Sequence, residues 1–280
     1  MKTSLLILTI AISFVLRANE DFLEAISQNK VSYSISYKSF GEKGISLNIK
    51  NLTANVISLS IAPGTIFLPE SDDEQTLMNA DEQLIVLRPK AEDFVLVDGY
   101  CINYNKLAPS EESTYKIKKT NNPNLIALLD YFKQNPISKD NYQAAIWAVS
   151  DNEDIAYIEP ITESDKGVRE LIAKMTNRPN PWYSKDEKIE VEPRQVIARG
   201  SSVVEGILSM TPEKDVEVYV TVENSNMEQI RDYPGMKFDK GWSTNLRFKI
   251  AVSGWEKGNY TATIRDKATG EGLKTFEFSI

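Results

Sequence analysis

The stretch VSYSISY at residues 31–37 alternates an apolar or aromatic residue with serine at every second position. Side chains of a β-strand point alternately to opposite faces, so this period of two gives one apolar face and one hydroxyl face. Such a segment lies with its apolar face on a hydrophobic core and its serines toward water. The stretch therefore predicts a half-buried strand and a β-rich domain around it.

Further short apolar runs follow this strand and are separated by turn-forming pairs such as Pro63-Gly64 and Asp98-Gly99. Regularly spaced short strands with Gly and Pro between them are typical of a β-sandwich. We therefore expect a mainly β fold with an N-terminal β-sandwich. The predicted strands cover residues 45–49, 56–61, 84–87, 94–97 and 114–117.

The pattern changes to helical spacing after residue 121. Asn122-Pro123 has the form of a helix cap followed by proline in the first turn, and Leu125, Leu128, Leu129 and Phe132 follow on one face. A second helix is expected over about 140–149. A third is expected after Ser164 as its cap, with Val168, Leu171, Ile172 and Met175 on one stripe. Residues 19–176 thus predict a sandwich with about three helices attached.

A proline-rich segment, NRPNPW at residues 177–182, cannot continue a helix, because each proline restricts itself and the residue before it. We predict a linker over 177–188. Alternating segments without a helical stripe follow at 203–208, 216–222, 246–252, 260–264 and 273–280. Residues 189–280 therefore predict a C-terminal immunoglobulin-like β-sandwich of ordinary size.

The N-terminus, residues 1–18, has one early lysine and an apolar run from Leu5 to Leu16. The run is shorter than the roughly 20 residues of a membrane-spanning helix and fits a secretory signal peptide. Cleavage after Ala18 is expected, and an uncleaved signal anchor is the alternative. No later segment is apolar enough to span a membrane. We expect a secreted, periplasmic or cell-surface protein.

Two counts restrict the chemistry of the 280-residue chain, which has no histidine and one cysteine. The lack of histidine excludes Ser-His-Asp and Cys-His catalysis and histidine-bound zinc. One cysteine excludes an internal disulfide, unusual for an exported protein. The net charge of -8 argues against a nucleic-acid partner. No pattern indicates a cofactor, and the acidic cluster at 151–154 lacks the Gly and Glu of a calcium-binding EF-hand loop.

Three motifs occur in a fixed order: YCIN at residues 100–103, NLIALL at 124–129 and YQAAIW at 142–147. This order resembles that of bacterial surface thioester domains. The resemblance implies that Cys101 and Gln143 are joined by an internal thioester and that the protein has an adhesive function. The sequence has Tyr142 where the family usually has threonine, and QNP at 134–136 where the family has Gly-Tyr-Pro.

The residues around Gln143 give a physical argument of their own. On a helix, Gln143, Ile146 and Trp147 share one face, so the carboxamide lies among large apolar groups and needs a hydrogen-bond partner or a covalent one. If Cys101 lies opposite, its thiolate can attack the Gln143 carbonyl and expel ammonia. The aromatic residues that would shield the bond are Tyr100, Tyr142 and Trp147.

Simpler interpretations of the same residues stay open. Cys101 can be an ordinary buried thiol or can form an intermolecular disulfide, Gln143 can hydrogen-bond a neighbouring strand, and Trp147 can be a core residue. We expect an exported or cell-surface, non-enzymatic binding or adhesion protein whose partner is a surface protein or a glycan. The alternative is a secreted carboxylate-dependent hydrolase such as a glycosidase, which needs two carboxyl groups facing each other across a cleft.

Overall fold

The computed structural model describes residues 19–280 except for 40, 187 and 193. The predicted signal peptide and its cleavage site at Ala18 fall outside the described residues on their N-terminal side. The chain is mainly β with a helical section, as predicted. In the part of the chain that is described, no helix is long and apolar enough to cross a membrane.

The N-terminal domain consists of two sheets that pack face to face. The larger sheet has the order β2-β3-β8-β6-β5-β9 and the smaller has the order β1-β4-β7. Buried side chains such as Leu47 and Leu59, one from each sheet, belong to the same core. The strands are β1 (Glu20–Asp21), β2 (Val31–Tyr37), β3 (Gly41–Asn51), β4 (Ile57–Ile61), β5 (Thr65–Pro69), β6 (Leu77–Met78), β7 (Gln83–Leu87), β8 (Glu92–Cys101) and β9 (Tyr115–Lys119).

Strand β2 confirms the prediction from its alternating sequence. Its three serines are exposed, whereas Val31 is buried and the two tyrosines and Ile35 are half-buried. It pairs antiparallel with β3, with Ser34 opposite Asn48.

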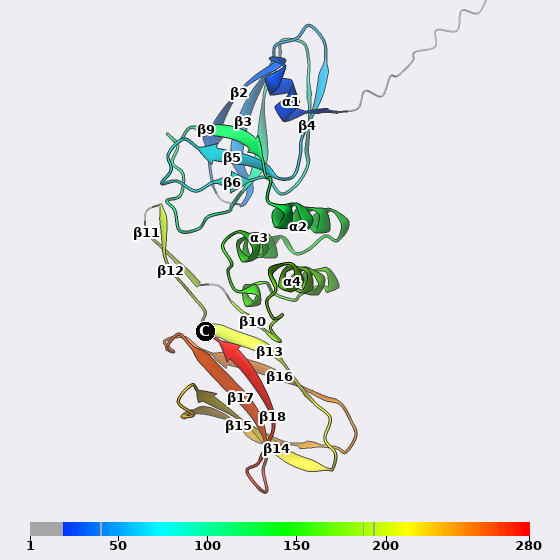
Figure 1. The fold of residues 1–280 in the computed structure, drawn as a ribbon, viewed down its shortest axis with the longest axis vertical. Coiled ribbons are helices and arrows are strands. Elements are labelled where there is room, and N and C mark those ends of the chain that lie inside the picture. Colours follow the sequence, from blue (N-terminus) through cyan, green and yellow to red (C-terminus); the bar gives the residue numbers. More distant parts are fainter. Residues whose placement is uncertain (1–18, 40, 187, 193) are drawn as a thin grey trace, which may run out of the picture.

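Three helices form a layer between the N-terminal sheets and the C-terminal sandwich (Figure 1). They enclose a second core that contains Leu128, Ile146 and Ile172. The helices of the chain are α1 (Phe22–Ser27), α2 (Pro123–Gln134), α3 (Tyr142–Ser150) and α4 (Glu163–Thr176), with short 3-10 helices η1 (Lys139–Asn141) and η2 (Ile155–Tyr157). Asn122 caps α2 through its side chain, as predicted.

The predicted cap of α4 is wrong: the cap lies two residues before Ser164. Thr162 is the cap, and its hydroxyl accepts a hydrogen bond from the Asp165 N–H at 3.1 Å. The Asp165 carboxylate in turn accepts the Thr162 N–H at 2.9 Å, which completes a capping box. Ser164 lies inside the first turn, where the box leaves it no capping role.

The C-terminal sandwich consists of two antiparallel sheets, β10-β13-β16 and β15-β14-β17-β18. This is an immunoglobulin-like arrangement, as predicted. Its first strand, β10, lies within the segment predicted as a linker, and Trp182 and Tyr183 pack on its core. The strands are β10 (Tyr183–Lys185), β13 (Val203–Met210), β14 (Val216–Asn224), β15 (Gln229–Phe238), β16 (Thr244–Ala251), β17 (Asn259–Asp266) and β18 (Gly272–Ser279).

A hairpin of β11 (Lys188–Glu192) and β12 (Gln195–Gly200) is inserted between β10 and β13. It runs back from the junction to the N-terminal domain, beside the helical layer (Figure 1). At its tip, Arg194 donates to the Ala108 carbonyl oxygen at 2.8 Å and pairs with the Glu74 carboxylate. The hairpin therefore connects the two domains a second time.

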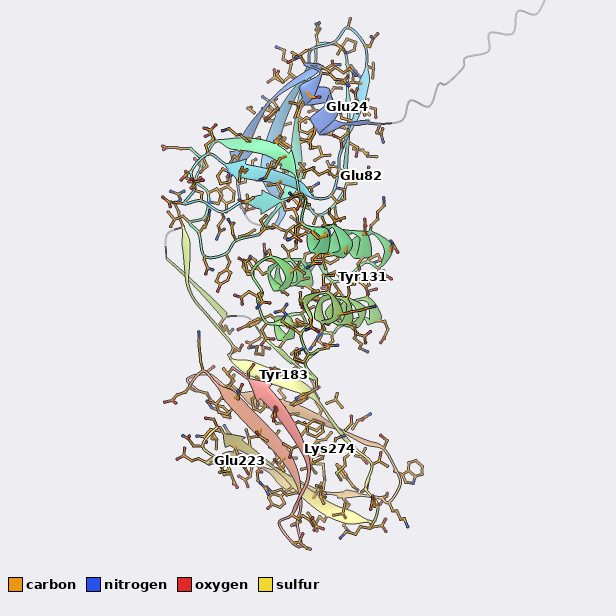
Figure 2. All side chains as sticks on the ribbon, viewed as in Figure 1. Glu24, Glu82, Tyr131, Tyr183, Glu223 and Lys274 are labelled. Atoms are coloured by element: carbon orange, nitrogen blue, oxygen red, sulfur yellow. The ribbon has the colours of Figure 1, made fainter. Side chains whose placement is uncertain are left out.

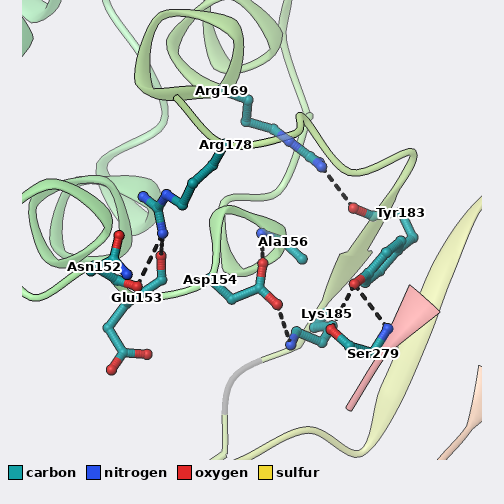
Figure 3. Close-up of polar contacts among 9 residues, drawn as sticks. All are labelled: Asn152, Glu153, Asp154, Ala156, Arg169, Arg178, Tyr183, Lys185 and Ser279. Atoms are coloured by element: carbon teal, nitrogen blue, oxygen red, sulfur yellow. Dashed lines mark hydrogen bonds and ion pairs between the residues drawn. The ribbon is translucent and has the colours of Figure 1, made fainter. Parts of the chain in front are cut away.

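Buried charged side chains hold the helical layer on the C-terminal sandwich (Figure 3). Lys185 is almost fully buried and pairs with Asp154 at 2.7 Å. The guanidinium of Arg169 donates to the carbonyl oxygens of Pro181 and Tyr183 at 2.6 and 2.7 Å. Ala156 of η2 belongs to the core of the C-terminal sandwich, so the two domains share buried surface.

Candidate thioester site

The two predicted thioester residues, which are 42 positions apart, are in direct contact. The Cys101 N–H donates to Oε1 of Gln143 at 3.0 Å, and Nε2 of Gln143 donates to the Cys101 carbonyl oxygen at 2.8 Å. The carboxamide thus pairs with the Cys101 backbone as a neighbouring strand would. This contact supplies the hydrogen-bond partners that the apolar surroundings of Gln143 require.

Local structure explains why these residues meet. Cys101 is the last residue of β8, where Leu77 of β6 pairs with it. Gln143 lies in the first turn of α3, which packs against β8. Strand β6 pairs with Cys101 on one side of β8, and on the other side the pairing with β3 reaches only Gly99. The N–H and C=O groups of Cys101 on that side therefore have no strand partner among the described residues. The Gln143 side chain fills that position.

The Cys101 sulfur is buried in the sandwich core, with the residue 1% exposed. Burial raises the pKa of the thiol to about 12, although hydrogen bonds from the Asn103 N–H and the Trp147 side chain favour the thiolate. The Asn103 nitrogen lies 3.4 Å from the sulfur. The free thiol is therefore neutral at physiological pH.

The three predicted shielding aromatics are all buried, but they divide between two cores. Trp147 lies with Cys101 in the sandwich core. Tyr100 and Tyr142 lie in the helical core, with ring centroids 5.5 Å apart. The division follows from strand alternation, because Tyr100 and Cys101 point to opposite faces of β8. Trp147 therefore shields the sulfur, and the two tyrosines pack behind the strand.

Residues outside the predicted set complete the site. Tyr104 packs on Trp147 with ring centroids 5.8 Å apart. Gln75 holds the loop after Cys101 by donating to the Tyr104 and Lys106 carbonyl oxygens at 3.1 and 2.9 Å. Asn103 belongs to the YCIN motif, so the sequence could have indicated its place beside Cys101. Gln75 carries no sequence signal for this role.

The two sides of the site differ in exposure. Cys101 is fully buried, whereas Gln143 is half-buried. A molecule from solvent can therefore reach part of the Gln143 residue, whereas the Cys101 residue is closed to it. This arrangement suits an electrophilic carbonyl carbon with a protected leaving group.

In the cleft between the helical layer and the C-terminal sandwich, Asp154 has the wrong electrostatics for a glycosidase acid. The cleft has a volume of about 350 Å³ and includes Glu153, Asp154 and Lys185 in its lining. Burial would raise the pKa of Asp154, but the ion pair with Lys185 holds it below its ordinary value. A general acid requires a raised pKa. Within the described residues, no group of three or more His, Cys, Asp or Glu side chains could hold a metal ion.

Asp98 has a raised pKa, which burial causes. It lies on β8 outside this cleft, and its carboxylate accepts the Lys43 N–H at 3.0 Å. A cavity of about 560 Å³ lies at the far end of the C-terminal sandwich, beside Met210, Lys214 and Leu273, and it contains no pair of carboxylates. These features do not favour the hydrolase.

No protein-family model matches the sequence, and no curated protein matches it.

Proposed function

We propose that this chain is an exported or cell-surface binding protein in which Cys101 and Gln143 form an internal thioester for covalent attachment to a partner. The observation that supports the proposal is the paired hydrogen bonding between the Gln143 carboxamide and the Cys101 backbone. It joins the Gln143 carboxamide to the backbone of the residue that carries the one thiol of the chain. The apolar run at residues 1–18 supports export.

The thioester can form from Cys101 and Gln143 alone, without a further reactant. The Cys101 sulfur bonds to Cδ of Gln143, the bond from Cδ to Nε2 breaks, and the nitrogen leaves as ammonia with the thiol proton. The carboxamide must first leave its two hydrogen bonds with the Cys101 backbone. The product carries no charge, so burial of the sulfur, which opposes the thiolate, does not oppose the thioester.

Attachment is the second step. An amine of the partner attacks Cδ, the carbon–sulfur bond breaks, and the proton lost by the amine returns to Cys101 as a thiol. The partner is then joined to Gln143 through an amide. A surface protein supplies such an amine from lysine, and a hydroxyl of a glycan gives an ester by the same route. Trp147 and the core around Cys101 limit hydrolysis before a partner arrives.

A labelled primary alkylamine tests the proposal. After incubation, intact-mass and peptide analysis should find the amine bound to Gln143, with Cys101 released as a thiol in equal amount. Neither Cys101→Ala nor Gln143→Ala should take up label, whereas the exposed-glutamine control Gln28→Ala should react like the native chain. Labelling that persists in Cys101→Ala, or no labelling of the native chain, would refute covalent attachment.

The proposed export is tested separately from the thioester. N-terminal sequencing of the protein recovered outside the cytosol should begin at Asn19. Retention of the whole chain in the cytosol would contradict this part of the proposal and leave the thioester to be judged by labelling.

A further inference from the structure

Strand β7 forms an open edge of the smaller N-terminal sheet. In the described part of the chain it pairs with β4 alone, with Ser58 opposite Val86 and Ser60 opposite Leu84. Its opposite side has backbone groups directed away from the sheet. An open edge of this kind is a template for pairing with another strand.

Other sheet edges of the molecule have features that oppose such pairing. Edge strand β9 carries Lys116, Lys118 and Lys119, β15 contains Pro234 and irregular register, and β16 carries Arg247 and Lys249. Lysine, proline and bulges are the devices by which proteins block their edges. Strand β7, with the sequence QLIVL, has none of them.

The outward face of β7 is also apolar. Leu84 is 53% exposed and Val86 is 65% exposed. Strand β2 is another uncharged edge, but the side chains it exposes are serines. Strand β7 therefore combines an open ladder with exposed apolar side chains, and a partner strand would cover both.

The residues that flank β7 indicate which partner fits. The alternation of exposure continues beyond the strand, so Glu82, Leu84, Val86 and Arg88 form one exposed row. Consider two copies of this strand paired antiparallel about a two-fold axis at Ile85. Glu82 of each copy then faces Arg88 of the other, and Leu84 of each copy faces Val86 of the other. The row is thus complementary in charge and in apolar character to a second copy of itself.

We propose that two copies of this chain associate through antiparallel pairing of their β7 strands, with Ile85 at the two-fold axis. The two three-stranded sheets then form one continuous six-stranded sheet. Glu82 lies in the N-terminal domain, on the side of that domain near the helical layer (Figure 2), and the C-terminal sandwich lies beyond that layer (Figure 1). Pairing there leaves the C-terminal sandwiches of both copies free.

Sedimentation equilibrium of the purified chain over a range of concentrations, under reducing conditions, tests this dimer. The native chain should show reversible monomer–dimer association. Arg88→Glu places two pairs of like charges across the axis and should weaken association at least tenfold. The double variant Glu82→Arg/Arg88→Glu restores opposite charges and should restore association to within about threefold of native. Lys118→Glu, the same charge change on exposed edge strand β9, is the matched control and should leave it unchanged.

Three results would overturn the proposal: a native chain that stays monomeric at every concentration, a dimer that Arg88→Glu does not weaken, or a double variant that fails to recover while circular dichroism finds it folded. Reducing conditions remove any contribution from a Cys101 disulfide. The proposal is independent of the thioester, so Cys101→Ala should dimerise like the native chain.

Discussion

At the scale of single residues, the Gln143 carboxamide has both a structural role and a proposed chemical role in the site. Its carboxamide makes two hydrogen bonds with the Cys101 backbone, so it stabilises the fold even where no covalent bond forms. The same contact holds the carboxamide at the backbone of the residue that carries the only thiol of the chain. The structural role and the chemical role are therefore compatible, and they can be measured separately.

The hydrogen-bonding role is best measured in the Cys101→Ala background, which cannot form a thioester. There, Gln143→Ala should lower the free energy of unfolding by about 1 to 3 kcal/mol, because two backbone groups at the end of β8 lose their partners. Urea denaturation gives this difference. Gln28→Ala, at an exposed position, should change stability by less than about 0.5 kcal/mol. Equal effects of the two substitutions would mean that the Gln143 contact contributes nothing.

The free Cys101 thiol should make stability depend on alkaline pH. Its pKa is raised by burial to about 12 in the folded state from an unfolded value of 9.0, so between these values the unfolded chain loses the proton first. In Gln143→Ala, stability should therefore fall above pH 9, by up to about 1.4 kcal/mol per pH unit. Subtracting the curve of Cys101→Ala/Gln143→Ala removes the tyrosine contributions. A flat difference curve from pH 8 to 11 would contradict the burial of the thiol.

At the scale of elements, strong local signals predicted structure well. The alternation at 31–37 gave β2, and the cap and stripe after Asn122 gave α2. Elements without such signals were missed. Helix α1 has only six residues, β6 has two, and β15 is mostly exposed and contains a proline, so none shows a clear period. Strand pairing forms β6 and β15, and pairing is not visible in local sequence, whereas α1 is too short to show a helical stripe.

The capping box of α4 shows how far a local pattern extends into tertiary structure. The buried Asp165 carboxylate also accepts hydrogen bonds from the Ser138 N–H at 3.0 Å and from Asn141 Nδ2 at 2.9 Å. Burial would raise its pKa, but the hydrogen bonds from Asn141, Thr162 and Ser138 bring it below the ordinary value. Asp165 thus fixes η1, just before α3, as well as the start of α4.

Asp165→Asn should consequently be less stable than the native chain by about 2 kcal/mol at pH 7, because hydrogen bonds to a charged acceptor are lost. A carboxyl with a depressed folded pKa stabilises the protein above its unfolded pKa near 4, and this contribution is lost as pH falls through the folded value. The native advantage should therefore shrink between pH 5 and pH 2 in denaturation experiments. An advantage that stays constant across this range would show that the Asp165 charge is not involved.

At the scale of the whole molecule, the chain is two sandwiches joined through a helical layer. Lys185, 4% exposed, pairs with Asp154 and lies 4.6 Å from the centre of the Tyr157 ring. Removing one partner from a buried ion pair leaves the other charge without compensation. Asp154→Ala should therefore destabilise the chain by about 2 to 4 kcal/mol.

The double variant Asp154→Ala/Lys185→Met should recover part of that loss, because it removes both charges. Calorimetry of the three proteins gives the comparison. Asp154→Ala should also expose the segment 177–188 to limited proteolysis sooner than the native chain. If the double variant is less stable than Asp154→Ala, the uncompensated charge is not the cause of the loss.

Contact between Cys101 and Gln143 is a property of the whole fold. Composition and period predicted a buried thiol and a carboxamide in need of a partner, but nothing local pairs residues 42 positions apart. Only the resemblance of the YCIN and YQAAIW motifs to thioester domains connected them. The structure places their polar atoms in contact. The division of the aromatics between two cores was not predicted, because it depends on which face of β8 each helix covers.

The most direct test of the central claim is the intact mass of the purified protein before any nucleophile is added. The native chain should have a mass lower than that of the plain processed chain by one ammonia molecule, and a disulfide reagent that reacts with thiols in acid should find no thiol at Cys101 after acid denaturation. Cys101→Ala and Gln143→Ala should both have their plain masses. A native chain with the full mass, whose Cys101 is alkylated as soon as it is unfolded, would contradict the thioester.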